Sequence, residues 1–132
     1  MELAKSASAL SVVQREPFIV MSITGKPSED RVLAEIEGLL SDSSALPEEP
    51  VVLCDNRGFE RLVSRSFIDR VLEAARTNVA KVAGGRVALV AGSTAQFGMQ
   101  RMFTLRAEEL PFEAKAFQNV DDARQWLSRG SD

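Results

Sequence analysis

Apolar residues follow two spacings along this chain, and the spacing separates predicted strands from predicted helices. Short apolar runs of strand length cover 10–14, 18–24, 51–54, 87–91 and 112–117. Apolar residues that recur every three or four positions predict helices over 28–40, from Ser64 or Ser66 to the stop at Gly84-Gly85, over 95–109 and over 120–127. The elements therefore follow one another in the order ββαβαβαβα.

The predicted strands differ in how the rest of the protein covers them. The runs 51–54 and 87–91 are apolar without alternation, which is typical of central strands buried on both faces. The run 112–117 alternates apolar and polar residues, which predicts a half-buried edge strand. Only three residues separate the first two runs, so we expect an antiparallel pair of strands at the N-terminal edge.

Strands that alternate with helices form a mostly parallel sheet through right-handed crossovers. We therefore expect one α/β domain over residues 1–132, with residues 1–9 flexible. Helices should cover both faces of the sheet. Ser28 and Asn119 are the predicted N-caps of the first and last helices, Gly84-Gly85 ends the second helix, and Pro111 ends the third.

Composition narrows the function by exclusion. The chain has no His and a single Cys, so His-containing catalytic triads, His zinc sites and an internal disulfide cannot form within it. No other catalytic constellation is visible, and we expect a protein that is not an enzyme and uses neither cofactor nor metal. Cys54 ends an apolar strand and is expected to pack as a small hydrophobe.

Charge and hydropathy bear on partners and location. There are 16 Lys+Arg against 19 Asp+Glu, a net charge of -3, whereas nucleic-acid binding needs a strongly basic surface. No apolar run approaches the ~20 residues of a membrane span. We therefore expect no nucleic-acid partner, no membrane insertion and a cytoplasmic location.

Two polar stretches follow central strands, where open α/β sheets bind ligands. Asp55, Asn56 and Arg57 are candidate binding residues, but the same triplet could form only a turn whose carboxylate accepts backbone N–H groups. Ser93 and Thr94 open the third helix, where backbone N–H groups could hold a phosphate or a hydroxyl could simply cap the helix. Both alternatives stay open for each stretch.

The helix predicted over 95–109 carries more apolar residues than one stripe requires. Phe97, Met99, Met102 and Phe103 could pack in the core, form a homodimer interface or border a pocket for an acyl chain.

Four segments of the chain resemble the small bacterial STAS-like proteins, the SpoIIAA-like group, which is related in fold to the lipid-binding CRAL-TRIO/SEC14 modules. The segments are 18–25, 51–58, 85–91 continuing to 97–103, and 117–127. The resemblance implies a STAS-like fold and a role in regulation through protein interaction.

The resemblance also bears on a phosphorylation switch. In the anti-sigma-factor antagonists of the STAS family, a strand ending Asp-x-x-Gly leads to a helix whose first turn carries a phosphorylatable serine after an aspartate. Asp55 and Gly58 match the strand end, but Val63 stands at the aspartate position before Ser64. Ser64 and Ser66 are candidate switch residues, and helix capping explains both without a switch.

These observations lead to two functional expectations. The first is a non-enzymatic STAS-like interaction module that works as a homodimer and binds a protein partner. The alternative is a carrier of a small apolar ligand or lipid, of the SEC14-like type.

Overall fold

The computed structural model describes residues 10–15, 18–42 and 46–128, so the prediction for residues 1–9 lies outside the described part of the chain. Its strands are β1 Leu10–Arg15, β2 Phe18–Ile23, β3 Val51–Asp55, β4 Arg86–Val90 and β5 Glu113–Phe117. Its helices are α2 Glu29–Ser41, α3 Arg65–Thr77, α4 Val79–Val82, α5 Thr94–Arg106 and α6 Val120–Ser128, with a 3-10 turn, η1 Ala107–Glu109. The predicted α/β order is confirmed.

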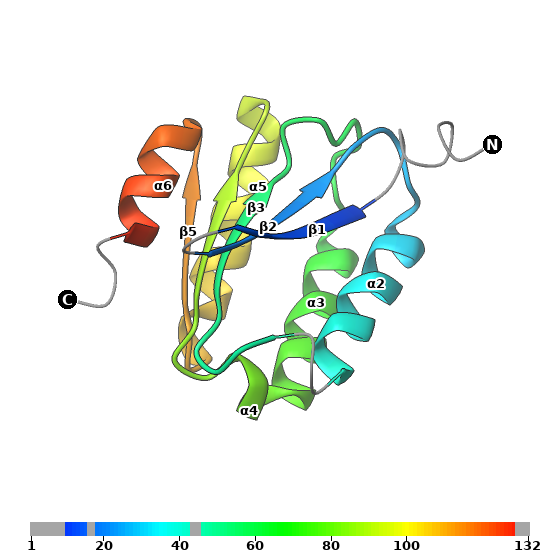
Figure 1. Ribbon diagram of the computed structural model, residues 1–132. Coiled ribbons are helices and arrows are strands. Elements are labelled where there is room, and N and C mark those ends of the chain that lie inside the picture. Colours follow the sequence, from blue (N-terminus) through cyan, green and yellow to red (C-terminus); the bar gives the residue numbers. More distant parts are fainter. Residues whose placement is uncertain (1–9, 16–17, 43–45, 129–132) are drawn as a thin grey trace.

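The strands of the described residues form one sheet in the order β1-β2-β3-β4-β5 (Figure 1). β2, β3, β4 and β5 pair in parallel, and β1 pairs with β2 in antiparallel register from Leu10 opposite Ile23 to Arg15 opposite Phe18. The predicted mostly parallel sheet is therefore correct, with β3 and β4 at its centre and β5 at one edge.

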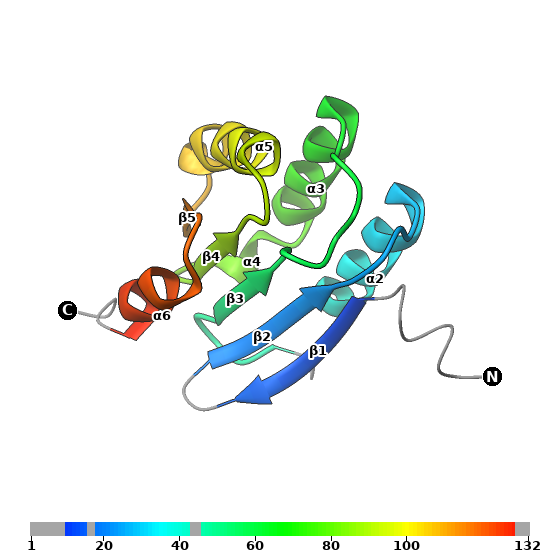
Figure 2. The same ribbon diagram turned by 90° about the horizontal axis from the view of Figure 1, so that it is seen from above.

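The helices divide unequally between the two faces of the sheet. α2, α3 and α5 lie on one face, and α6 lies on the other (Figure 2). The parallel strands follow one another across the sheet in chain order, so each crossover steps in the same direction. A right-handed crossover that always steps the same way places every connecting helix on the same face. We call this the crossover face, and the opposite side the α6 face.

The α6 face is closely packed. Leu53, Ala88 and Val90 on the strands and Ala123 on α6 are each at most 1% exposed. Beside them, the guanidinium of Arg86 lies 4.0 Å from the ring centroid of Trp126 and donates a 2.8 Å hydrogen bond to the Trp126 carbonyl oxygen. Because Ala123 has only a methyl group, α6 approaches the central strands closely.

Helix ends follow the predicted caps with two corrections. Ser28 and Ser64 accept hydrogen bonds from the backbone N–H groups of Arg31 and Phe67, and Asn119 accepts from Asp121 and Asp122. The second helix does not run on toward Gly84-Gly85, because α3 ends at Thr77. There the side-chain amide of Asn78 donates a hydrogen bond to the Ala74 carbonyl oxygen and ends the regular helical hydrogen-bond pattern. The third helix is α-helical only to Arg106, and its last turn is the 3-10 turn η1.

On the crossover face, α2 and α3 stand farther from the strands, whereas α5 lies close to the edge strand β5. The backbones of α2 and α3 make few close approaches to any strand, whereas α6 lies close to β3 and β4. Large side chains fill part of the space, among them Phe67 of α3 packed with Ile23 of β2, and Phe103 of α5 packed with Leu72 of α3. The rest of the space is the cavity described next.

Candidate functional site

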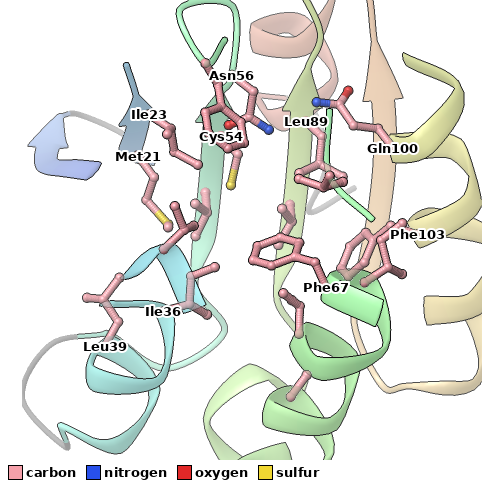
Figure 3. A pocket seen from close by; sticks show the side chains of 18 of the residues that line it. Met21, Ile23, Ile36, Leu39, Cys54, Asn56, Phe67, Leu89, Gln100 and Phe103 are labelled. Atoms are coloured by element: carbon pink, nitrogen blue, oxygen red, sulfur yellow. The ribbon is translucent and has the colours of Figure 1, made fainter. Parts of the chain in front are cut away.

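A cavity of about 230 Å³ lies between the sheet and the helices of the crossover face (Figure 3). Its floor consists of alternate residues of three neighbouring strands: Met21 and Ile23 of β2, Val52 and Cys54 of β3, and Val87 and Leu89 of β4. Its walls come from α2, α3 and α5, and include Ile36, Leu39, Phe67, Val71, Met99 and Phe103. Side chains of a strand alternate between its faces, so every second residue of each buried strand borders this space.

The lining is apolar except at one end. There the side chains of Asn56, after β3, and Gln100, from α5, lie at the same end of the cavity, with Leu89 beside them (Figure 3). The remaining polar lining residues are Gln96 and Arg61. No acidic residue lines the cavity within the described part of the chain. The site can therefore surround an apolar body and hydrogen-bond one polar group.

The two glutamines of α5 differ although they are one helical turn apart. Gln96 is fully used in the fold: its Oε1 accepts from the Gly92 backbone N–H at 2.8 Å, and its Nε2 donates to the Phe59 carbonyl oxygen at 2.7 Å. Gln100 is 9% exposed, and no donor in the described residues reaches its buried Oε1. Buried acceptors are nearly always paired in folded proteins, so the unpaired Gln100 Oε1 is an exception among the described residues.

Cys54 points into the cavity (Figure 3). Burial, and to a lesser degree the neighbouring charge of Asp55, raise the pKa of its thiol to about 12. The thiolate is the nucleophilic form of cysteine, so this side chain is a poor nucleophile at neutral pH. Cys54 is thus part of an apolar wall, in the role of small hydrophobe that the sequence predicts.

The cavity volume limits the size of a ligand. An engineered cavity of ~150 Å³ holds benzene, and pockets for drug-sized ligands measure roughly 300–1,000 Å³. At about 230 Å³, this cavity lies between the two. It fits a small ring or a medium-length aliphatic chain, and it is too small for a whole membrane lipid.

The predicted triplet after β3 is divided between the two faces. Asn56 lines the cavity, whereas Asp55 lies on the α6 side, where its carboxylate accepts hydrogen bonds from the Arg57 backbone N–H at 3.1 Å and from the Arg57 guanidinium at 2.8 and 2.9 Å. The hydrogen bond from that side chain lowers the pKa of Asp55. This is the turn geometry that the sequence offered as one alternative, with both charges already paired.

Ser93 and Thr94 lie at the start of α5 outside the cavity lining. Ser93 caps the helix by accepting from the Gln96 backbone N–H at 3.1 Å. The preceding Gly92 is packed so closely that an added Cβ would lie 2.8 Å from the Arg57 carbonyl oxygen. The capping alternative therefore accounts for this stretch, and a phosphate site there stays a prediction.

Ser64 joins two helices of the crossover face. Its hydroxyl donates to Glu29 Oε1 at 2.9 Å and its backbone N–H donates to Glu29 Oε2 at 2.7 Å, while the same hydroxyl caps α3. Ser66 lies in the first turn of α3 and is exposed. A phosphate on Ser64 would meet the Glu29 carboxylate and break this connection. Phosphorylation at either serine stays a prediction.

The apolar excess of α5 lies mostly inside the protein. Met99, Met102 and Phe103 pack against the cluster of Ile68, Leu72 and Ala107, and Met99 and Phe103 also border the cavity. Phe97 is half-buried, and the most exposed large apolar side chain of the helix is Leu105, at 57%. Met99 and Phe103 thus pack in the core and border the cavity, whereas a homodimer interface or an acyl-chain pocket at this helix stays a prediction.

Neither Gln100 nor the cavity itself was predicted from the sequence. One signal was available: Gln96, Gln100 and Phe103 recur at helical spacing, so the inward side of a mostly apolar helix carries two amides. A polar residue on the buried side of a helix needs a partner or a ligand. The sequence could not show which of the two glutamines lacks a partner.

The described residues bear on metal binding and on membrane spanning. No group of three or more His, Cys, Asp or Glu within them could hold a metal ion. None of the helices that the structure describes is long and apolar enough to span a bilayer.

Comparison with known proteins identifies the fold. No family model and no curated protein matches this chain. A solved structure does: an uncharacterized protein of the DUF3478 family with a SpoIIAA-like fold, from Shewanella loihica PV-4, with a TM-score of 0.57 and 19% identity. The match covers 90% of this chain and 92% of that one. The chain thus has a SpoIIAA-like fold, as the resemblance of its sequence to STAS-like proteins implied.

Proposed function

We propose that this protein is a non-enzymatic STAS-like binding module that holds a small apolar ligand in the cavity of its crossover face. The observation that carries the proposal is an apolar cavity of about 230 Å³ with a polar end. Of the two functions expected from the sequence, the cavity favours the apolar-ligand carrier over the interaction module.

The energy of such a cavity supports binding. The apolar side chains that border the cavity lack packing partners on the side that faces it. Whole domains are stable by only ~5–15 kcal/mol, so a few restored contacts matter. A ligand that supplies the missing contacts should therefore make the protein more stable than it is without the ligand.

The chemistry of the lining supports binding without catalysis. The thiol that faces the cavity has a pKa of about 12, and the carboxylate beside it is paired with Arg57 on the other side of the sheet. The remaining lining side chains are mostly hydrocarbon, which offers neither a general acid nor a general base. The site can select a ligand by shape and by one hydrogen bond.

The test combines native mass spectrometry with thermal unfolding. We expect protein purified under mild conditions to carry a small molecule, and added n-heptanol to raise the Tm by several degrees at saturation. Cys54→Phe should abolish the shift because the new ring fills the cavity, whereas Leu105→Phe, on the exposed side of α5, should keep it. Absence of both a bound molecule and a Tm shift in the wild type would refute the proposal.

A second candidate function, interaction through a homodimer, is favoured by the outer side of α5. Leu105 is 57% exposed there, and Gly98 on the same side has no atom within 4 Å of an added Cβ, so a neighbouring helix could approach closely. Multi-angle light scattering should then show a dimer that Leu105→Glu converts to monomer. Because Met99 and Met102 pack in the core, Leu105 is the better position for this test. A wild type that stays monomeric at high concentration would count against the dimer.

A further inference from the structure

Two side-chain amides at the polar end of the cavity take no part in holding the fold together. Gln100 of α5 and Asn56 after β3 both line the cavity there, and neither side chain makes a hydrogen bond to a residue that the structure describes (Figure 3). Gln96, one turn before Gln100, uses both ends of its amide on the backbone of Gly92 and Phe59. Because buried amides are normally hydrogen-bonded, the unused pair is a place where a bound molecule can make polar contacts.

The two ends of the Gln100 amide lie in different surroundings. Oε1 is enclosed by the protein, with almost no accessible surface and no donor among the described residues. Nε2 is not enclosed in this way, and it points toward Asn56 at the end of the cavity (Figure 3). A molecule in the cavity therefore meets the N–H donors of Gln100, whereas the oxygen of this amide is out of its reach.

We propose that the ligand of this cavity carries an uncharged hydrogen-bond acceptor, a carbonyl oxygen, at one end, and that Gln100 Nε2 donates a hydrogen bond to it. Asn56, toward which this nitrogen points, offers a second amide at the same end. This inference rests on the proposed function, because it specifies the ligand of the same cavity. It goes further by assigning the polar group of the ligand and the residue that recognises it.

Charged head groups fit this end less well. An ammonium would meet the N–H donors of Gln100, and no acidic residue lines the cavity in the described chain to balance its charge. A buried carboxylate needs a cation, but Arg61, the cationic residue of the described lining, is exposed and donates its Nε to the Lys26 carbonyl oxygen. Burial also raises the pKa of the nearby Cys54 thiol, since these surroundings disfavour a negative charge.

The size of the cavity sets the apolar part. Its volume of about 230 Å³ lies between that of a benzene site and that of a drug pocket, which suits a chain or small ring of about seven non-hydrogen atoms. Medium-chain ketones therefore represent the class, because they combine an apolar body with one acceptor oxygen, no donor and no charge.

The experiment compares two molecules of the same shape that differ in the acceptor. Methyl butyl ketone has a carbonyl oxygen, and its alkene isostere has a CH₂ group in that place. NMR titration gives the affinity of each for the wild type and for Gln100→Met, a variant that keeps the length of the side chain but has no amide. The ratio of ketone affinity to alkene affinity should be about tenfold lower in the variant, because losing the hydrogen bond affects only the ketone.

Two controls accompany this comparison. The alkene should bind Gln100→Met within about twofold of its affinity for the wild type, because the substitution nearly conserves volume and the cavity stays intact. Hexanoate supplies an anionic head on a similar chain, and it should bind the wild type more weakly than the ketone.

A second measurement does not depend on the variant. In wild-type protein, the side-chain N–H resonances of Gln100 should shift when the ketone is added and move less with the alkene, since only the ketone accepts a hydrogen bond. Those of Gln96 serve as the matched control, because its amide is already engaged by Gly92 and Phe59.

Each outcome decides between the two proposals. A ketone-to-alkene ratio that is unchanged in Gln100→Met, or Gln100 resonances that respond equally to both molecules, would overturn the role of Gln100 and leave the apolar cavity site standing. Tightest binding of hexanoate would overturn the uncharged head group in favour of an anion. Failure of every probe to bind the wild type would overturn the proposed function and this inference with it.

Discussion

On the α6 face, Leu53 and Ala88 are at most 1% exposed and the space between sheet and helix is filled, whereas on the crossover face their neighbours Cys54 and Leu89 border a cavity. The four residues form two adjacent pairs across the same two strands, with Leu53 opposite Ala88 and Cys54 opposite Leu89. The strands thus offer similar apolar side chains to both faces. The difference lies in the helices that cover them.

The covering helices differ in the size of the residues that they turn toward the sheet. α6 presents Ala123, which lets its backbone approach β4, and Trp126 packs against Arg86 at the side. α3 presents the large ring of Phe67, and the backbones of α2 and α3 stay farther from the strands than that of α6. One sheet can therefore support a packed core on one side, which stabilises the fold, and a binding cavity on the other. Four predictions test this comparison.

The largest expected effect is on the reactivity of Cys54, whose thiol borders the cavity of the crossover face. With a pKa of about 12, its thiolate fraction at neutral pH is about three thousand times smaller than that of an ordinary cysteine with a pKa of ~8.5. Alkylation by iodoacetamide should be slower by a similar factor, and its rate should keep rising about tenfold per pH unit between pH 7 and 10. Mass spectrometry can follow the reaction. A rate that levels off near pH 9 would show that the thiol is not held in an apolar cavity.

Leucine truncation compares the two faces directly. Leu53→Ala should lower the free energy of unfolding by about 3 kcal/mol, because it opens a void in a filled region. Leu89→Ala, on the adjacent strand but bordering the cavity, should cost only about 1 kcal/mol, because the side chain has fewer packed neighbours to lose. Urea unfolding measures both. Equal losses would mean that the two faces are packed alike.

Enlarging a side chain should have opposite signs on the two faces. Ala88→Ile adds carbon atoms to a filled space and should cost about 2 kcal/mol. Cys54→Ile adds them to the cavity and should stabilise the protein by about 1 kcal/mol, a rise of about 3 °C in Tm, while weakening the binding of apolar probes. Calorimetric unfolding of both variants is the measurement. A destabilised Cys54→Ile protein would contradict the cavity.

The smallest expected effect is the acid sensitivity of the Asp55–Arg57 pair on the α6 side. The pKa of Asp55 is lower in the folded protein than its ordinary value of ~3.9 in the unfolded chain, so the pair contributes stability above that pH and loses it as the pH falls through the folded pKa. Because Arg57 is half-exposed, the contribution should be below about 1 kcal/mol. Urea unfolding between pH 5 and 2.5 should show a smaller loss for Asp55→Asn than for the wild type.

Much of the fold was predictable because it depends on short-range patterns. Unbroken apolar runs marked β3 and β4 as buried strands, and helical spacing marked α2 to within one residue of its observed ends. Ser28 and Asn119 cap the helices that the sequence assigned to them. The errors occurred at helix ends, where Asn78 interrupts the second helix and a 3-10 turn ends the third, because both depend on local backbone geometry that spacing does not reveal.

The site was less predictable than the fold. The sequence predicted Asp55, Asn56 and Arg57 as one candidate site. Because side chains alternate between the two faces along a strand, Asn56 lines the cavity and Asp55 lies on the other face. Gln100 was not predicted as a site residue, because a glutamine on a helix looks the same in sequence whether its side-chain oxygen is paired, as in Gln96, or unpaired.

The sequence by itself determined the order of strands and helices, the absence of histidine chemistry and the apolar character of both faces of the sheet, because these follow from residue type and from spacing over a few positions. Tertiary structure alone decided that α2, α3 and α5 share one face, that α2 and α3 stand off the sheet, and that a cavity of about 230 Å³ remains beneath the three helices. The physical reason is that a cavity is set by distances between elements far apart in the chain. Those distances depend on crossover handedness and on how bulky side chains pack together.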